Sequence, residues 1–452
     1  MSRLKKKENT SQEYRGEREG ILKRFRESVV FISVDGKTRK DPNKTINFDL
    51  SQPILDVEWD VELAKELVSR RIFDSRLNSR NKIDQSGVWR FREIVHPLLN
   101  DDEIITRPEG RTNLYSHKRL SEYTGVKNVQ VKAEGENPTS SFKDRGITVI
   151  ISEARRLGMD TVACASTGNT SAAVPAYASM CGMKSLDFIP EGNIAFGKLA
   201  QAMAYGAKVL QVKGNFDEAL TLVRIVCREF GIYLANSVNP WRIEGQKTIS
   251  LDILQQLSWE TPDWIVLPGG GLGNTAAQCK GLIELFELGI IDKIPRVASI
   301  QAHGANPFYS MRCKGSNTLV PVQSPETIAT AIRIGNPASW QRVMKVFERV
   351  KGVCEEVTDQ EIMDGKAIVD GCGIGCEPAS AASVAGLKKL KEKGIIKEDE
   401  SAVCILTGNI LKDPNATVNY HKGELGGIAP LFANEPKVVE ANLEAIKREL
   451  KI

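Results

Sequence analysis

The residues best suited to chemistry stand in one stretch, residues 137–146, which reads Asn-Pro-Thr-Ser-Ser-Phe-Lys-Asp-Arg-Gly. Its lysine, Lys143, follows small hydroxyl residues and the aromatic Phe142, and Gly146 comes shortly after it. A lysine attacks a carbonyl carbon only as the neutral amine, and a dry, close-packed surround favours that form. The stretch therefore indicates a lysine that forms an imine with an aldehyde cofactor. The alternative interpretation is a helix start that carries a lysine by chance.

Two further loops each follow an apolar run and precede a helical pattern. Residues 164–171 read Cys-Ala-Ser-Thr-Gly-Asn-Thr-Ser, and residues 267–274 read Leu-Pro-Gly-Gly-Gly-Leu-Gly-Asn. At a strand-to-helix turn, free backbone N–H groups and the helix dipole attract an anion, and glycine lets the amides approach it closely. Both loops therefore predict anion sites. A plain helix cap is the alternative for the first loop. A dinucleotide site is the alternative for the second, but no acidic residue follows at a strand end about 20 residues later, as that site requires.

Two other segments carry side chains that suit a phosphate ester or a cofactor ring. Residues 236–248 read Asn-Ser-Val-Asn-Pro-Trp-Arg-Ile-Glu-Gly-Gln-Lys-Thr, where Asn236 and Ser237 offer donors and Arg242 can bind a phosphate through two N–H groups. A surface arginine after a turn is the alternative. Thr407 stands at the end of an apolar run, where a strand-end hydroxyl without a special role is the alternative.

The cysteines and histidines do not suggest a metal centre. The nine cysteines are scattered and mostly lie in apolar runs, as free thiols do in a reducing compartment. Cys372 and Cys376 have no histidine nearby, so we expect ordinary packing there, with a redox pair as the alternative and no zinc. The four histidines show no paired spacing, and we expect no metal site.

A regular alternation of strands and helices must position these residues. We expect buried strands at residues 161–165, 185–189, 208–212, 232–236, 264–267, 297–302 and 402–407. Helical periodicity predicts helices at residues 171–181, 195–205, 217–230, 245–257, 275–289 and 380–393. Near-continuously apolar strands that alternate with helices predict an α/β fold with parallel sheets covered on both faces.

Composition limits the classes of function. The chain has 452 residues, 41% of them hydrophobic and 26% charged, and its net charge of +4 is too small to argue for nucleic acid or a membrane. We find no apolar run that could span a bilayer and no signal peptide, so we expect a cytoplasmic protein. Basic residues crowd the first thirty positions among glutamates. This pattern predicts a solvated or frayed arm, and we expect the first forty-five residues to be dispensable for chemistry.

These motifs, in this order, resemble those of the tryptophan-synthase-β-like pyridoxal-phosphate enzymes (fold type II), over roughly residues 50–420. Lys143-Asp-Arg-Gly and residues 236–248 most resemble the threonine synthases. The resemblance implies pyridoxal 5'-phosphate as the cofactor, held as an imine by Lys143. It also implies cofactor contacts at Asn169 (phenolic oxygen), Gly270, Gly271, Leu272, Gly273 and Asn274 (phosphate) and Thr407 (pyridine nitrogen). The implied site for the substrate phosphate consists of Ser166, Thr167, Thr170, Asn236, Ser237 and Arg242.

The resemblance also implies an organisation and a reaction. We expect a basic arm and small N-terminal extension at residues 1–100, a large cofactor domain at 101–154 and 246–435, a small mobile domain at 155–245, and a C-terminal helix at 436–452. The implied enzyme is a homodimer that converts O-phospho-L-homoserine and water into L-threonine and phosphate by γ-elimination and β-addition. Three alternatives stay open: a cysteate synthase that uses O-phosphoserine and sulfite, a threonine or serine dehydratase, and a pyridoxal-fold binding module without activity. Asn409 and Ile410 stand where many threonine synthases have His-Gly, so the role of position 409 stays open.

Overall fold

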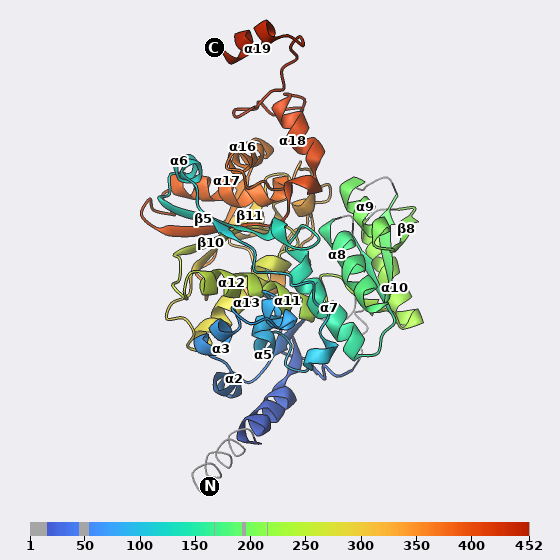
Figure 1. Ribbon diagram of the computed structural model, residues 1–452. Coiled ribbons are helices and arrows are strands. Elements are labelled where there is room, and N and C mark those ends of the chain that lie inside the picture. The colour runs from blue at the N-terminus through green and yellow to red at the C-terminus, as the bar shows by residue number, and fades with distance from the viewer. Residues whose placement is uncertain (1–15, 45–53, 167, 192–195, 215, 452) are drawn as a thin grey trace.

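The described part of the chain forms three β-sheets (Figure 1). The computed structural model describes residues 16–44, 54–166, 168–191, 196–214 and 216–451. Thr167, the first fifteen residues of the basic arm and residue 46 lie outside the described residues. All seven expected strands are present, which confirms the predicted α/β fold.

The largest sheet has six strands in the order β12-β11-β10-β13-β5-β4. All neighbouring pairs are parallel except β4 and β5, which are antiparallel. The strands are β4 (Leu114–Tyr115), β5 (Asn128–Ala133), β10 (Trp264–Pro268), β11 (Arg296–Ala302), β12 (Val353–Val357) and β13 (Ser401–Leu406). Because neighbouring parallel strands end at the same edge of a sheet, the residues after β10 and β13 meet at one edge.

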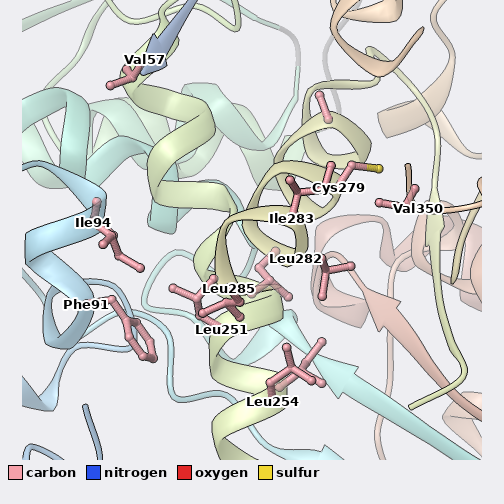
Figure 2. Packing of buried hydrophobic residues seen from close by; sticks show 14 of the residues in the cluster. Val57, Phe91, Ile94, Leu251, Leu254, Cys279, Leu282, Ile283, Leu285 and Val350 are labelled. Atoms are coloured by element: carbon pink, nitrogen blue, oxygen red, sulfur yellow. The ribbon is translucent and has the colours of Figure 1, made fainter. Parts of the chain in front are cut away.

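Helices cover both faces of this sheet (Figure 1). Alternate residues of β10 point to opposite sides: Val266 packs with α17, whereas Leu267 packs with α12 and α13. The second side holds the largest apolar cluster, where Leu251, Leu254 and Leu282 meet (Figure 2). The helices around this sheet are α6 (Lys118–Thr124), α7 (Lys143–Arg156), α11 (Pro240–Gln246), α12 (Thr248–Gln256), α13 (Gly273–Glu287), α14 (Pro307–Cys313), α15 (Trp340–Val346), α16 (Asp359–Asp370), α17 (Pro378–Glu392) and α18 (Pro414–His421).

A second, four-stranded parallel sheet has the order β8-β7-β6-β9 and lies beside the first (Figure 1). Helices α7 and α8 pack on one of its faces, and α10 packs on the other. The elements of this unit are β6 (Thr161–Ala165), α8 (Asn169–Ala178), β7 (Lys184–Pro190), α9 (Phe196–Ala204), β8 (Lys208–Val212), α10 (Phe216–Phe230) and β9 (Tyr233–Leu234).

The N-terminal region corrects one expectation. The arm predicted to be solvated is helical at residues 16–28 and continues into β1 (Val30–Ser33), which pairs with β2 (Arg39–Lys40) and β3 (Leu55–Glu58). Phe25 and Phe31 are buried, and Phe31 meets the ring of Trp241 edge to face at 5.5 Å. The expectation of a frayed arm is therefore wrong for residues 25–33. The expectation rested on the high charge density of this region. A few apolar residues that point inward are enough to bury the segment once a strand distant in sequence pairs with β1.

The remaining elements lie at the two ends of the chain. Helices α2 (Val61–Leu67), α3 (Arg70–Ser75), α4 (Lys82–Gln85) and α5 (Arg92–Val95) connect the N-terminal sheet to the core. The predicted C-terminal helix is α19 (Leu443–Leu450), which projects away from the body (Figure 1). Across the described ranges, no helix has both the length and the apolar character that a membrane crossing would need.

Candidate active site

Lys143 is the first residue of α7, and the loop before it is joined to the end of β13. Ser141 forms a β-bridge with Gly408, and the Phe142 N–H donates to the Thr407 carbonyl at 3.0 Å. The Asn409 N–H donates to the Ser140 carbonyl at 3.0 Å. These bonds bring the predicted lysine and the predicted strand-end threonine to the same edge of the large sheet.

The surroundings of Lys143 favour its neutral amine. Burial lowers the pKa of Lys143 to about 7, the positive charge of Arg242 adds to this effect, and the carboxylate of Glu377 opposes it. The amine nitrogen lies 4.1 Å from the centroid of the Phe142 ring. The Lys143 side chain is half-buried, so its amine is both accessible and partly neutral near pH 7, and it can act as a nucleophile or as a base.

Two glycines bring α11, which carries Arg242, close to α7. A Cβ at Gly146 would lie 2.7 Å from the Arg242 Cγ, and a Cβ at Gly245 would overlap the Arg145 carbonyl group. The helices can approach this closely only because both positions lack a side chain. Contact between them sets the guanidinium beside the Lys143 end of α7.

Arg242 is buried, in contrast to the alternative of a surface arginine. Its Nη2 donates to the Thr170 hydroxyl at 2.7 Å, and its Nη1 donates to the Ala235 carbonyl at 3.3 Å, whereas its Nε has no partner among the described residues. Burial lowers the pKa of Arg242 to about 10, so it remains a cation at neutral pH. A buried cation with free donors suits a phosphate group.

The predicted residues Asn236 and Ser237 differ in whether their polar atoms remain available to a phosphate. The Asn236 amide donates to the Ala165 carbonyl at 2.8 Å and accepts from the Ala165 N–H at 2.9 Å. It therefore joins the segment after β9 to the end of β6, which favours a structural role. Ser237 is partly exposed, and its phosphate contact stays a prediction.

The loop after β6 leads into α8 and carries Asn169 at the start of that helix. The Ser166 hydroxyl accepts from the Gly168 N–H at 3.0 Å, and Thr170 is held by Arg242. Asn169 is buried, its Nδ2 donates to the Glu377 carboxylate at 2.9 Å, and its Oδ1 has no partner among the described residues. Sequence patterns marked Asn169 but gave Glu377 no role.

The glycine-rich loop follows β10 and leads into α13, as predicted. Leu272 adopts a left-handed conformation with φ of 63°, and α13 starts at Gly273. A Cβ at Gly270 would lie 3.0 Å from the Ile332 Cα, so a side chain there would crowd Ile332, and the glycine lets the loop pack closely against it. Asn274 is buried, and its Nδ2 has no partner among the described residues. The helix start and this unsatisfied donor suit an anion.

Thr407 follows β13 and faces a second hydroxyl, which the sequence patterns did not single out. The hydroxyl oxygens of Thr407 and Ser380 lie 3.0 Å apart, and Ser380 also accepts from the Gly408 N–H at 2.9 Å. Both residues are buried. The pair is uncharged, as expected for a group that contacts a ring nitrogen without protonating it.

A buried ionic network lies behind the lysine helix. Asp252 forms ion pairs with Arg90, with Lys132 at 2.8 Å and with Arg145 at 2.7 Å, and Arg145 also pairs with Glu134 at 2.7 Å. The three cations lower the pKa of Asp252 and keep it ionised. Arg145 belongs to the first turn of α7, so the network joins that turn to α12 and to the residues after β5, and loss of one member would leave an uncompensated buried charge. In the part of the chain that the structure describes, no three histidine, cysteine or acidic side chains gather so that they could hold a metal ion.

Comparisons with known proteins identify the relatives of this chain. The family model described as "Pyridoxal-phosphate dependent enzyme" matches residues 105–408. A threonine synthase of Methanocaldococcus jannaschii is 45% identical over 399 residues, which cover 88% of this chain and 93% of that protein. A threonine synthase of Methanosarcina acetivorans is 46% identical over 370 residues, which cover 82% and 88% of the two chains. The solved structure of maize serine racemase shares the fold with a TM-score of 0.58 at 23% identity, over 66% of this chain and 88% of that one.

Proposed function

The chain belongs to the pyridoxal-phosphate dependent enzymes and, within them, to the threonine synthase family, and on that premise we propose that it converts O-phospho-L-homoserine and water into L-threonine and phosphate. The observation that carries the proposal is the pairing of a reactive amine with a phosphate-type cation. Lys143 begins α7, and the buried Arg242 packs against Gly146 one turn along the same helix, where its positive charge lowers the pKa of the lysine.

The residues present fit pyridoxal phosphate. Asn169 has a second amide hydrogen beyond the one it donates to Glu377, and the buried Nδ2 of Asn274 has no partner among the described residues. We propose that the 270–274 loop holds the cofactor phosphate, that Lys143 holds the aldehyde carbon, and that Asn169 donates its second amide hydrogen to the phenolic oxygen. Thr407 would face the ring nitrogen.

When bound, the cofactor supplies an aldehyde that couples to amines and a conjugated ring that accepts electrons. The neutral amine of Lys143 can take a proton from the substrate α-carbon and later from the β-carbon. Arg242, with Thr170 and Ser166 beside it, would bind the phosphate that leaves the γ-carbon. Thr407 and Ser380 present neutral hydroxyls, which leave the ring a moderate electron acceptor.

A contact between the turn after β13 and helix α9 of the four-stranded unit can help to exclude water from the site. Lys412, in the turn Ile410–Lys412 after β13, donates to Gln201 on α9 of the four-stranded unit. We propose that this unit closes over the substrate and that the Lys412–Gln201 bond forms in the closed state. Helix α11 packs on α7 and α13, so we propose that the mobile unit ends before α11 and not at residue 245 as expected from the sequence, which places Arg242 on the static side of this movement. The homodimer and the cytoplasmic location stay predictions.

The proposal is tested by substrate choice. Purified protein is incubated with O-phospho-L-homoserine, with O-phospho-L-serine plus sulfite, and with L-threonine, and the products are separated. We expect L-threonine and phosphate from the first substrate alone. Cysteate from the second, or 2-oxobutyrate as the main product from L-threonine, would replace the proposed function by one of the alternatives.

The role of Lys143 is tested by its removal. Lys143→Ala should lose the visible absorbance of the lysine-bound cofactor and essentially all turnover, while the exposed Lys127→Ala should keep both. Borohydride treatment of the wild-type enzyme should fix the cofactor on the peptide that contains Lys143. Normal turnover in Lys143→Ala would overturn the assignment of the reactive amine.

A further inference from the structure

Glu377 is a buried carboxylate whose position is fixed by the fold. It is 2% exposed and caps α17 immediately before Pro378. Its backbone N–H donates to the Gly408 carbonyl at 3.0 Å, which ties it to the segment that follows β13. A Cβ at Gly408 would lie 2.5 Å from the Glu377 Oε1, so the glycine is required for the carboxylate to occupy this place.

The carboxylate determines which way the Asn169 amide points. An ionised carboxylate only accepts hydrogen bonds, so the amide must turn its nitrogen toward Glu377, and the two groups lie 2.9 Å apart. One amide hydrogen is used in this contact, and the second remains available. A neutral amide at position 377 could accept or donate, and it would then allow both orientations of Asn169.

The same carboxylate acts on Lys143. The other charged side chain that acts on the lysine is Arg242 on α11, which favours the neutral amine. Asp144, the next residue of α7, accepts from the Thr139 N–H at 2.6 Å, and burial raises its pKa to about 7. Glu377 raises the pKa of Lys143 against burial and Arg242. A base works best when its pKa lies near the working pH, and without this charge the amine would be a weaker base.

We propose that Glu377 is a positioning residue of the active site: its carboxylate orients the Asn169 amide and balances the charge of Arg242 beside Lys143. The proposal deepens the proposed function and rests on it for the identity of Lys143 as the reactive amine. It concerns the charge and the hydrogen bonding of the protein itself, so a readout independent of turnover can test it.

The test compares Glu377→Gln with Glu355→Gln in the full-length chain. Glu355 is an equally buried glutamate on the edge strand β12, so it controls for loss of a buried carboxylate. The cofactor is removed, and the rate at which an amine-reactive reagent labels the Lys143 peptide is followed by mass spectrometry as a function of pH. Loss of a single interior charge is worth on the order of one pKa unit. We expect Glu377→Gln to move the labelling midpoint to lower pH by about that amount and Glu355→Gln to leave it in place.

A second readout tests the orientation of the amide. Above the titration of Lys143, Glu377→Gln should bind pyridoxal phosphate about tenfold more weakly in the wild-type background and should have no added effect in Asn169→Ala. An unchanged labelling midpoint, or the same loss of affinity in both backgrounds, would overturn the proposal. If Glu377→Gln does not fold, Glu377→Asp decides, since it withdraws the charge by one methylene. Its midpoint must fall, and an unchanged midpoint overturns the proposal. These outcomes do not depend on which substrate the enzyme uses, so they are separate from a failure of the proposed function.

Discussion

Removal of the Arg242 guanidinium is the perturbation with the most quantitative expectation. A guanidinium has five N–H donors, and the structure gives Arg242 one bond to Thr170 and one to Ala235. The remaining donors include the buried Nε, which has no partner among the described residues. Two of them can form a paired contact with a phosphate group. Loss of such a charge-assisted contact costs about 2–4 kcal/mol, so Arg242→Ala should reduce kcat/KM for O-phospho-L-homoserine about 30- to 1,000-fold.

The assay measures phosphate release over a range of substrate concentrations. Arg242→Lys should recover only part of the loss, because an ammonium group is a point charge and cannot make the paired contact. The control is Arg296→Ala, which removes a partly buried arginine at the start of β11, the end of the strand away from the site. It should keep kcat/KM within about twofold, as expected for a residue outside the site.

A second consequence comes from the effect of Arg242 on the lysine. The positive charge of Arg242 lowers the pKa of Lys143, so Arg242→Ala should raise that pKa and move the lysine labelling midpoint to higher pH. This shift is opposite in sign to the one expected for Glu377→Gln. Wild-type kcat/KM in Arg242→Ala would refute the assignment of the substrate phosphate site. An unchanged midpoint would refute the charge coupling.

Four further variants test other parts of the structure. Thr407→Ala should keep the bound cofactor, which is measured by absorbance per chain. It should lower kcat about five- to tenfold, which corresponds to the loss of one hydrogen bond. A site empty of cofactor would contradict this expectation. Lys412→Met should lose the bond to Gln201, raise KM and increase the share of substrate that water diverts to side products. An unchanged KM and an unchanged product ratio would contradict the proposed role of the Lys412–Gln201 bond in closure. Deletion of residues 1–15 should be tolerated. Deletion of residues 1–34 should lower the free energy of unfolding in urea by more than about 4 kcal/mol, because it removes the buried side chains of Phe25, Val29, Phe31 and Ile32. Equal unfolding midpoints for the two truncations would contradict this packing.

Several elements that carry the site could be predicted because each has a recognisable pattern within a few consecutive residues. The run that becomes β13 and the hydroxyl after it placed Thr407 correctly, and the glycines after β10 marked the turn into α13. Strand β5 precedes the stretch that carries Lys143, and it was not predicted from the sequence. Its six residues alternate apolar and polar side chains and so differ from the near-continuous apolar runs that marked the other strands. The helix expected at residues 245–257 starts earlier and divides at Lys247 into α11 and α12.

Contacts between distant segments could not be predicted from the sequence. The amide of Asn236 suits a phosphate as well as a backbone, and only the structure shows that Ala165 uses both of its polar atoms. The Glu377 carboxylate fits beside Gly408, and its partner Asn169 comes from the start of α8 in the four-stranded unit. Neither contact produces a spacing pattern in the sequence. Charge density at the N-terminus gave the wrong expectation for residues 25–33, since the strand pairing that buries them comes from β3.

The most direct test of the proposed reaction follows the oxygen of water. The wild-type enzyme is given O-phospho-L-homoserine in water enriched in ¹⁸O, and L-threonine and phosphate are analysed by mass spectrometry. If phosphate leaves by cleavage of its bond to the γ-carbon and water then adds at the β-carbon, each L-threonine should carry one ¹⁸O in its hydroxyl group. The phosphate formed in equal amount should carry none. Label in the phosphate with L-homoserine as the product would show attack of water at phosphorus, and it would contradict the proposed function.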